Sequence, residues 1–227
     1  MQKIVKSYDD FFKGYKSQTN RYDFFSKIIK KHKSIGKLLD VGCAHGYFLK
    51  FMQKKYSCTG LEYNFKAAKV AQKNTTAKIF VGSVESMKFF KTRTYDVITC
   101  FDVLEHVKYL DSAVSELSRI SKLDGLLIVS VPNTNSLGHK LKKKNWFGYR
   151  DRTHISLLTP ENWVLLFKQN KFIVIDKFYE GYFDIPYFFG PVIFQKIFLI
   201  PGFLMYKTGI RMIPNNGENI VFILKKE

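Results

Sequence analysis

The feature that most constrains the fold is the stretch Leu38–Lys50, with the sequence LLDVGCAHGYFLK. An apolar strand ends at Asp40, a loop carrying Gly42 and Gly46 follows, and an amphipathic helix comes next. Glycines let the backbone pass close to a ligand, and the N-terminus of the helix presents unpaired N–H groups to it. This strand–loop–helix unit predicts the ligand-binding turn of a doubly wound α/β fold.

Strand-like and helix-like segments alternate as far as Val131, which predicts a parallel sheet with crossover helices. The expected strands are Lys37–Val41, Ser57–Leu61, Lys78–Val81, Tyr95–Phe101 and Gly125–Val131. Helical periodicity without proline marks Tyr47–Lys55, Phe65–Lys73 and Leu110–Ser121. Residues 1–34 are expected to form a helical lead-in, whose apolar spacing suits an amphipathic helix ending near His32.

The alternation stops after Pro132, where a loop rich in Lys, Asn and aromatic residues is expected over residues 133–159. Thr159-Pro160-Glu161 is typical of a helix start with proline at the first helical position. Phe172–Phe178 and Asn219–Leu224 are predicted as two further strands. The residues between them are too many for a hairpin turn, so an insertion is expected over 180–218. We expect residues 1–227 to form a single domain.

Further polar motifs stand at the ends of the expected strands. Glu62 lies twenty residues beyond Gly42, where a carboxylate can accept both hydroxyl protons of a ribose. A solvated Glu at a strand end is the alternative. The later strand ends carry VGSVES, YDVITCFDVLEHV and LDGLLIVSVPN.

This ordered set of motifs resembles the class I S-adenosylmethionine-dependent methyltransferases. The resemblance is nearest to the branch with the ubiquinone-biosynthesis O-methyltransferases and related small-molecule and glycan enzymes, and it covers Arg21–Val131 best. It implies an α/β fold with a Rossmann-like, seven-stranded, mostly parallel sheet, an antiparallel last strand and helices on both faces. It also implies S-adenosylmethionine as the cofactor.

The resemblance implies a role for each matching position. The methionine half of the cofactor would be surrounded by Asp40, Gly42, Cys43 and Gly46, with Phe101 along the methionine chain and Arg21 facing its carboxylate. Glu62 would hold the ribose. The adenine would be bordered by Tyr63, Ser83 and Val84. Two positions depart from the family pattern. Ala44 replaces the middle glycine, and Ser83 stands where an Asp commonly takes the adenine amino group, so Glu85 or a backbone carbonyl is expected to substitute.

Methyl transfer from a sulfonium is already downhill, but a hydroxyl nucleophile must also lose its proton. One candidate group is Asp102, Glu105 and His106, which would share one face of a helix beginning at Phe101. Such a trio can bind a divalent metal. The stronger alternative is that acidic residues favour the first turn of a helix and that the Glu105–His106 pair buttresses the cofactor loop. No metal is therefore predicted, and His106 remains a candidate catalytic residue.

The second candidate region is Asn145–Pro160, with the sequence NWFGYRDRTHISLLTP. Its Asp-x-x-His followed by Thr-Pro resembles a feature that lies over the active site in this methyltransferase branch. His154 is predicted to be the general base, and Asp151 is predicted to orient it.

The chain carries 37 basic and 19 acidic residues, a net charge of +18. Such a field attracts nucleic acid, anionic lipid or phosphate-bearing substrates, although a generally Lys-rich composition is an equal alternative. Nucleic acid is disfavoured as a partner. Val131-Pro132-Asn133 replaces the signature of amino-methylating nucleic-acid enzymes, and Thr99 rather than Pro precedes Cys100, where cytosine C5 enzymes keep their nucleophile.

Tyr187–Tyr206 is almost wholly apolar but is interrupted by two prolines and by Gln195 and Lys196. These breaks argue against a membrane-spanning helix. A lid over the active site, or a segment in the interface of an anionic membrane, is expected; a helix pair packed on the sheet is the alternative.

The N-terminus lacks an apolar core of signal-peptide length, and the three cysteines form no CxxC pair. Both features favour a cytoplasmic location. Association with the cytoplasmic face of a membrane is an option.

The predicted function is O-methylation of a small hydroxylated, glycan or lipid-linked acceptor. An RNA methyltransferase and a non-catalytic methyltransferase-like binding protein are the alternatives. The missing Gly-x-Gly-x-x-Gly disfavours a dehydrogenase, and no oligomeric state is predicted.

Overall fold

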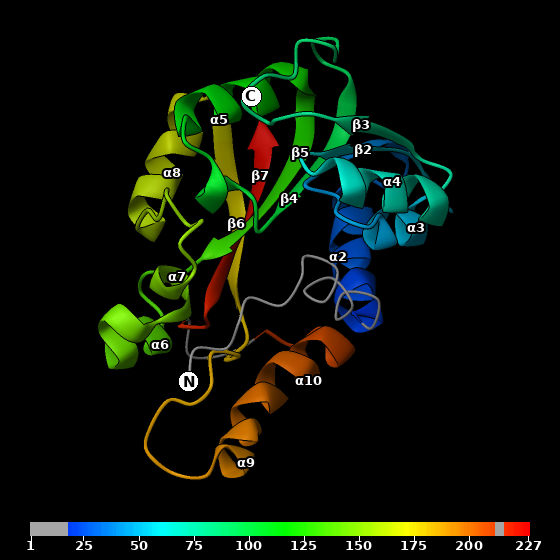
Figure 1. Cartoon of the computed structure of the whole chain (residues 1–227). Helices are drawn as coiled ribbons and strands as arrows, with labels where there is room; N and C mark the ends of the chain where they lie inside the picture. The colour runs from blue at the N-terminus through cyan, green and yellow to red at the C-terminus, as the bar shows by residue number, and fades with distance from the viewer. Residues whose placement is uncertain (1–17, 212–215) are drawn as a thin grey trace.

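A computed structural model describes residues 18–211 and 216–227, and its centre is a seven-stranded sheet of order β3-β2-β1-β4-β5-β7-β6 (Figure 1). The strands are β1 (Gly36–Val41), β2 (Tyr56–Glu62), β3 (Lys78–Val81), β4 (Tyr95–Phe101), β5 (Ser121–Pro132), β6 (Phe172–Glu180) and β7 (Asn219–Lys226). Strands β1 to β5 pair in parallel, whereas β7 is antiparallel to both β5 and β6. The predicted α/β fold class and antiparallel last strand are confirmed.

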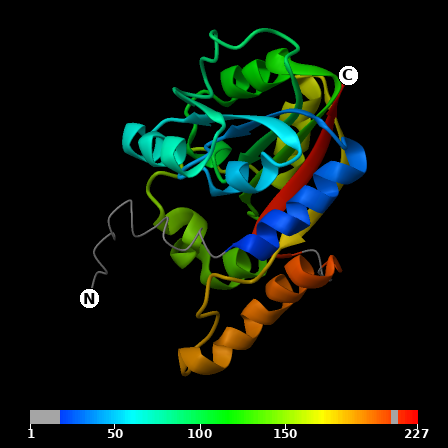
Figure 2. The same cartoon turned by 90° about the vertical axis from the view of Figure 1, so that its right-hand side faces the viewer.

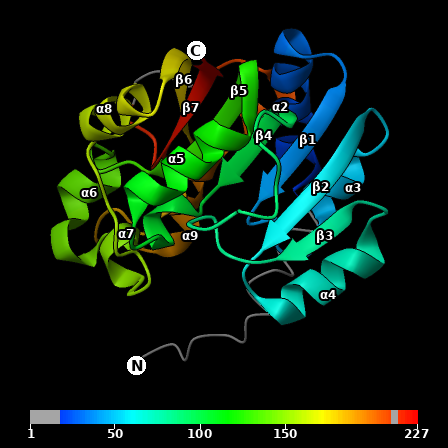
Figure 3. The same cartoon turned by 90° about the horizontal axis from the view of Figure 1, so that it is seen from above.

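Helices cover both faces of this sheet, as the view from above shows (Figure 3). Helices α2 (Thr19–His32), α3 (Tyr47–Met52) and α4 (Phe65–Asn74) pack on one face, and α5 (Leu110–Ile120) and α8 (Pro160–Gln169) pack on the other. Neighbouring residues of a strand point to opposite faces, so Leu38 joins one apolar core and Leu39 the other. Both faces are therefore buried, as expected for a parallel sheet with crossover helices.

The N-terminal lead-in is helical over the described residues. Tyr22, Phe24, Phe25 and Ile29 form the buried side of α2, while its lysines are exposed. The helix ends at His32, as its apolar spacing predicts, and residues 1–17 of the expected lead-in lie outside the described residues.

Two element boundaries next to turns differ from those that the sequence predicts. Helix α3 ends at Met52 instead of Lys55, because the chain turns into β2 at Tyr56. Strand β5 begins at Ser121 instead of Gly125, since Ser121 already pairs with Tyr95 ahead of a register shift.

The segment 133–159 is not the continuous loop that its composition predicts. It contains α6 (Leu137–Lys142), the 3₁₀ turn η3 (Lys143–Asn145) and α7 (Phe147–Arg150). Ser136 caps α6, because its hydroxyl accepts a hydrogen bond from the backbone N–H of His139. The predicted start of α8 is confirmed, with Thr159 as its cap and Pro160 as its first residue.

An insertion separates β6 and β7, two strands that pair with each other. It contains α9 (Val192–Gln195), η4 (Lys196–Leu199) and α10 (Ile200–Thr208), and it projects from one end of the molecule (Figures 1 and 2). Helix α10 packs chiefly against α2, and its Met205 joins the buried cluster that contains Phe178 of β6. The alternative of a helix pair packed on the sheet therefore does not describe the whole insertion. Among the residues described, no helix has the length and apolar character needed to cross a bilayer.

Candidate functional site

The glycine loop after β1 turns through left-handed backbone conformations. Gly42, Ala44 and Gly46 have φ angles of +73°, +47° and +75°. A side chain at Gly42 would also collide with Val103, because an added Cβ would lie 2.3 Å from the Val103 Cγ2 atom. The loop therefore needs a glycine at its first position, and the small Ala44 is accommodated where the family pattern has a glycine.

Glu62 ends β2 and is buried, at 5% exposed. Its two carboxylate oxygens accept hydrogen bonds from the backbone N–H groups of Ala44 and Asn64, each at 2.8 Å. These bonds hold the carboxylate between the glycine loop and the start of α4. A carboxylate oxygen accepts more than one hydrogen bond, so the same group suits the two hydroxyls of a ribose.

Asp40 lies at the end of β1 beneath the loop and is also buried. The hydroxyl of Thr99 donates to its Oδ1 atom at 2.7 Å. Burial raises the pKa of Asp40 to about 7, against the opposing effect of the Thr99 hydrogen bond. Cys43 is buried as well and extends toward Gly60 of β2.

The residues predicted to border the adenine lie beyond β2 and β3. Tyr63 is 78% exposed, and Val84 is buried. The Ser83 hydroxyl donates to Glu85, whose other carboxylate oxygen accepts from the backbone N–H of Tyr109 at 2.8 Å. A glycine turn, an anchored acid at the end of β2 and an open aromatic ring beside it together fit an adenosine-bearing cofactor.

Arg21 is expected to face the cofactor carboxylate, but in this structure its guanidinium binds protein carboxylates. Its Nε and Nη2 atoms lie 2.8 and 3.0 Å from the two oxygens of Glu180, and Nη2 is 3.5 Å from Asp102. The guanidinium also lies 5.3 Å from the centre of the Phe101 ring, which packs on Phe25 of α2. Although burial opposes the charge, the two carboxylates hold the pKa of Arg21 well above its usual value.

The predicted arrangement of Asp102, Glu105 and His106 on one helical face is wrong. Asp102 has a φ of +56°, and only Leu104–His106 form a turn of 3₁₀ helix, η2. The Asp102 carboxylate accepts hydrogen bonds from Ser130 and Asn219 and faces Arg21. It therefore belongs to the buried network at the end of β4, apart from the other two residues.

His154 takes the place expected for Asp102. Ligand atoms of Glu105, His106 and His154 all lie within 4.8 Å of one another. The backbone carbonyl of Glu105 accepts from the N–H groups of Ile155 and Ser156, at 2.9 and 3.0 Å, and so brings the two segments together. This group has the ligand types that bind a divalent cation.

Glu105 is 1% exposed, and its Oε2 atom makes no hydrogen bond within the described part of the chain. Burial, with the nearby charge of Asp102, raises the pKa of Glu105 well above its usual value. Burial also lowers the pKa of His106, and the neighbouring His154 adds to this effect. The two histidine rings lie with their centres 4.7 Å apart.

His154 is held by its own segment. Its Nδ1 atom is 2.9 Å from the carbonyl oxygen of Gly148. Since a carbonyl only accepts, Nδ1 carries a hydrogen, and in the neutral imidazole Nε2 presents a lone pair. Asp151 Oδ2 lies 3.8 Å from Nε2. The orienting hydrogen bond thus comes from Gly148, and Asp151 lies beside the atom that would receive a proton.

Sequence reasoning missed the residues that complete the buried network. Glu180 is the last residue of β6, two positions beyond the predicted strand end, and it binds Arg21, Ser130 and Tyr206. An acid at the carboxyl end of a strand was the available signal for Glu180. Nothing local to Ser130 or Tyr206 indicates this network.

Comparison with known proteins identifies the family. Residues 15–177 match the family model described as a methyltransferase domain. A protein of Methanocaldococcus jannaschii is 31% identical over 132 residues, which are 58% of this chain and 49% of that protein. A ubiquinone biosynthesis O-methyltransferase of Nitrosomonas europaea is 32% identical over 104 residues, 43% of this chain and 44% of the enzyme. The chain spans about half the length of the curated relatives it matches.

The solved structures agree on the fold. The crystal structure of an S-adenosylmethionine-dependent methyltransferase from Archaeoglobus fulgidus aligns with a TM-score of 0.70 at 18% identity, covering 97% of this chain and 100% of that one. The family model covers more than half of the chain, and the fold agrees with it. The chain therefore belongs to the methyltransferase domain family.

Proposed function

We propose that the protein methylates a hydroxyl oxygen of a small hydroxylated, glycan or lipid-linked acceptor. The carrying observation is the geometry of His154, whose Nε2 lone pair lies beside Asp151 while Nδ1 is fixed on Gly148. This histidine lies close to Glu105 and His106. Glu105 in turn is two positions along the chain from Val103, whose side chain lies against Gly42 of the glycine loop. A base is thus available next to the loop that would hold the cofactor.

The residues around the glycine loop would hold S-adenosylmethionine, with Glu62 on the ribose and Tyr63 beside the adenine. When bound, the cofactor supplies an electrophilic methyl group on a sulfonium. A carboxylate or a neutral amine is nucleophilic without a base, whereas a hydroxyl becomes a good nucleophile only as it loses its proton. The presence of an oriented histidine therefore favours a hydroxyl oxygen as the methylated atom.

In the proposed step His154 Nε2 accepts the acceptor's hydroxyl proton as the oxygen–methyl bond forms and the sulfur–methyl bond breaks, with the neutral thioether S-adenosylhomocysteine as the leaving group. The imidazolium that results keeps its Nδ1–H bond to Gly148 and gains the charge of Asp151 at 3.8 Å. Desolvation opposes ionisation of Asp151, but hydrogen bonds from the Thr153 hydroxyl and N–H lower the pKa of Asp151 below its usual value. Asp151 is therefore an anion at neutral pH and can stabilise this imidazolium.

The test is methyl transfer from tritiated S-adenosylmethionine to extracted lipids, glycans and RNA, with the labelled product analysed by mass spectrometry. We expect label as a methyl ether in the lipid or glycan fraction. His154→Ala should lower kcat by ~10²-fold with little change in cofactor affinity. His32→Ala is the matched control, because this exposed histidine is the last residue of α2 and lies outside the group. Label confined to RNA, or equal activity of wild type and His154→Ala, would overturn the proposal.

A chelator distinguishes the base from a metal ligand. If His154 is the base, activity survives chelation. If activity is lost and Mg²⁺ or Mn²⁺ restores it, Glu105, His106 and His154 act as cation ligands, and the cation lowers the hydroxyl pKa instead.

A further inference from the structure

The insertion exposes large apolar side chains over residues 188–204, which we name the apolar tip. Phe194 and Ile197 are 73% and 63% exposed, and Phe189, Ile193, Ile200 and Phe203 are also exposed. A lid closed on its own protein would bury such side chains. The tip instead projects beyond the body of the molecule, at the end where α6 and α7 lie (Figures 1 and 2). Exposed apolar surface of this extent marks an interaction site.

The polar groups of the apolar tip face inward. Gln195 is fully buried, its Oε1 atom accepts from the backbone N–H of Tyr187 at 2.7 Å, and its Nε2 atom donates to the carbonyl of Phe188 at 2.8 Å. A helix on a water-exposed surface has the opposite pattern, with polar side chains outside and apolar ones inside. The Gln195 amide thus satisfies backbone groups of the insertion internally, without water. Such pairing beneath an apolar surface is what a low-dielectric environment such as a membrane requires.

The solvent-exposed charge around the apolar tip is positive, because the nearest acids along the chain, Asp184 and Glu218, are buried. Neither 133–150 nor 185–217 contains an acidic residue. Lys196 and Lys207 are exposed within the insertion. On α6 and η3 a shallow hollow is lined by Lys140, Lys143 and Lys144 with His139 and Tyr149. Lysines that flank exposed aromatic and aliphatic side chains are suited to the headgroups of anionic lipids.

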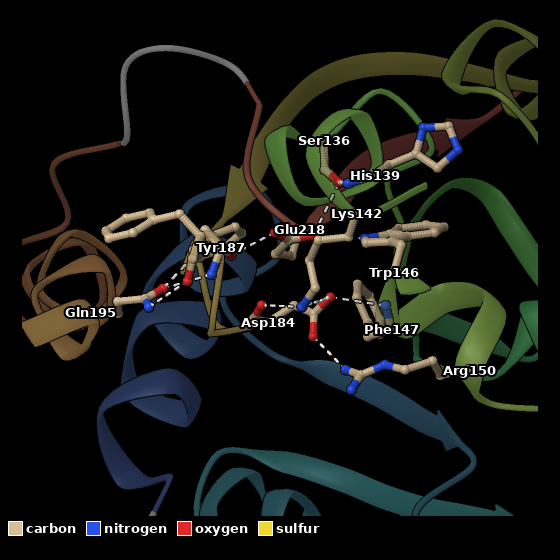
Figure 4. Close-up of polar contacts among 11 residues, drawn as sticks. Ser136, His139, Lys142, Trp146, Phe147, Arg150, Asp184, Tyr187, Gln195 and Glu218 are labelled. Atoms are coloured by element: carbon tan, nitrogen blue, oxygen red, sulfur yellow. Dashed lines mark hydrogen bonds and ion pairs between the residues drawn. The ribbon is translucent and has the colours of Figure 1, made fainter. Parts of the chain in front are cut away.

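The insertion is also fixed to the segment that holds His154, as Figure 4 shows. Asp184 accepts from the backbone N–H of Phe147 at 2.9 Å and pairs with Lys142 at 2.7 Å. Glu218 accepts from Trp146 Nε1 at 2.8 Å and also from the hydroxyl of Tyr187. Helix α7 carries the Gly148 carbonyl that orients His154. A surface that binds the apolar tip therefore also fixes the orientation of the segment 147–154, which we call the active-site segment, relative to that surface.

We propose that the apolar tip docks this protein on an anionic membrane surface. The tip side chains enter the boundary between headgroups and acyl chains, and the exposed lysines beside them contact lipid phosphates: Lys196, Lys207, Lys140, Lys143 and Lys144. The active-site segment then faces the membrane, where a lipid-linked acceptor would reach it; this last clause rests on the proposed function, whereas the docking does not.

The experiment is flotation of the full chain with vesicles of phosphatidylcholine, with and without about 30 mol% phosphatidylglycerol. We expect binding to the anionic vesicles, weakened ~10-fold or more when NaCl rises from about 0.1 to about 0.5 M. Phe194→Asp and Ile197→Asp should each weaken binding ~10-fold or more. Phe198 is a poor test position because its ring packs 5.1 Å from Tyr187 in the interior of the insertion.

Leu123→Asp is the matched control, since Leu123 is 55% exposed at the amino end of β5, away from the apolar tip. Calorimetry with S-adenosylhomocysteine on the same samples shows that each variant is folded, and it requires no methyl acceptor. Failure of flotation with intact cofactor binding would therefore leave the proposed methylation standing.

Three results would overturn the docking proposal. The protein could remain unbound by anionic vesicles at low salt, or Leu123→Asp could reduce binding as much as Phe194→Asp. Light scattering could show a dimer that Phe194→Asp dissociates without any vesicle binding, which would assign the apolar tip to a second copy of the chain.

Discussion

At the scale of single residues, Glu62 tests the cofactor site most directly. Its carboxylate is held by the N–H groups of Ala44 and Asn64. Glu62→Ala removes a charged acceptor for the ribose and should weaken binding of S-adenosylmethionine by about 1.5–3 kcal/mol, measured by titration calorimetry. Glu161→Ala, an exposed acid in the first turn of α8, should leave the affinity unchanged. Equal affinities for wild type and Glu62→Ala would contradict the assignment of Glu62 to the ribose.

Asp40 predicts a pH dependence of stability. Burial raises the pKa of Asp40 to about 7, above its value in the unfolded chain. The folded state therefore binds the proton more tightly, and the stability this contributes is lost as pH rises from about 4 through about 7. Asp40→Asn keeps an acceptor for Thr99 but has no charge, so it should gain on the order of 1–4 kcal/mol relative to wild type between about pH 4 and about pH 8.

Urea denaturation of wild type and Asp40→Asn at both pH values checks this prediction. Asp124→Asn controls for carboxylates in general, because Asp124 is an exposed acid paired with Lys225. A stability difference between wild type and Asp40→Asn that does not change with pH would show that Asp40 titrates normally.

At the scale of elements, the glycine loop joins β1 to α3 through backbone conformations that L-residues avoid. Gly42→Ala adds both a strained φ and a collision with Val103. It should lower the free energy of unfolding by about 2–4 kcal/mol. Gly209→Ala is a matched control, because Gly209 has a φ of +81° and no atom near its would-be Cβ.

The difference between Gly42→Ala and Gly209→Ala isolates the contact between the loop and Val103. Thermal or chemical denaturation measures it. Equal losses in the two variants would show that backbone strain alone governs the loop, and that its packing on the segment after β4 contributes little.

At the scale of the whole molecule, a net charge of +18 is the dominant electrostatic property. Like charges repel one another most in the compact state, and salt screens that repulsion. We expect Tm to rise as NaCl increases from about 0.05 to about 0.3 M, followed by scanning fluorimetry. Sodium perchlorate at the same low concentrations should raise Tm by a similar amount if screening is the cause. A Tm that falls or stays level in both salts would mean that favourable ion pairs outweigh the repulsion.

The sequence by itself determined the architecture of the sheet and the position of the cofactor turn. Strand and helix periodicity are local properties of the chain, so the alternation as far as Val131 predicts β1 to β5 and their helices. The carboxyl ends of parallel strands meet at one edge, and for that reason the order of the motifs along the chain is enough to place the glycine loop and Glu62 together.

The tertiary structure alone decided which side chains meet across that edge. Asp102 lies three residues from Glu105 in sequence, yet it faces Arg21 and Glu180, whereas His154 reaches Glu105 through the bonds of Ile155 and Ser156. Arg21 and Glu180 are 159 positions apart. Such contacts depend on how distant segments pack, and a left-handed residue such as Asp102 redirects the chain where periodicity would continue a helix. The inward turn of Gln195, which leaves the apolar tip exposed, was decided in the same way, because composition does not specify which side of a short helix faces the body of the molecule.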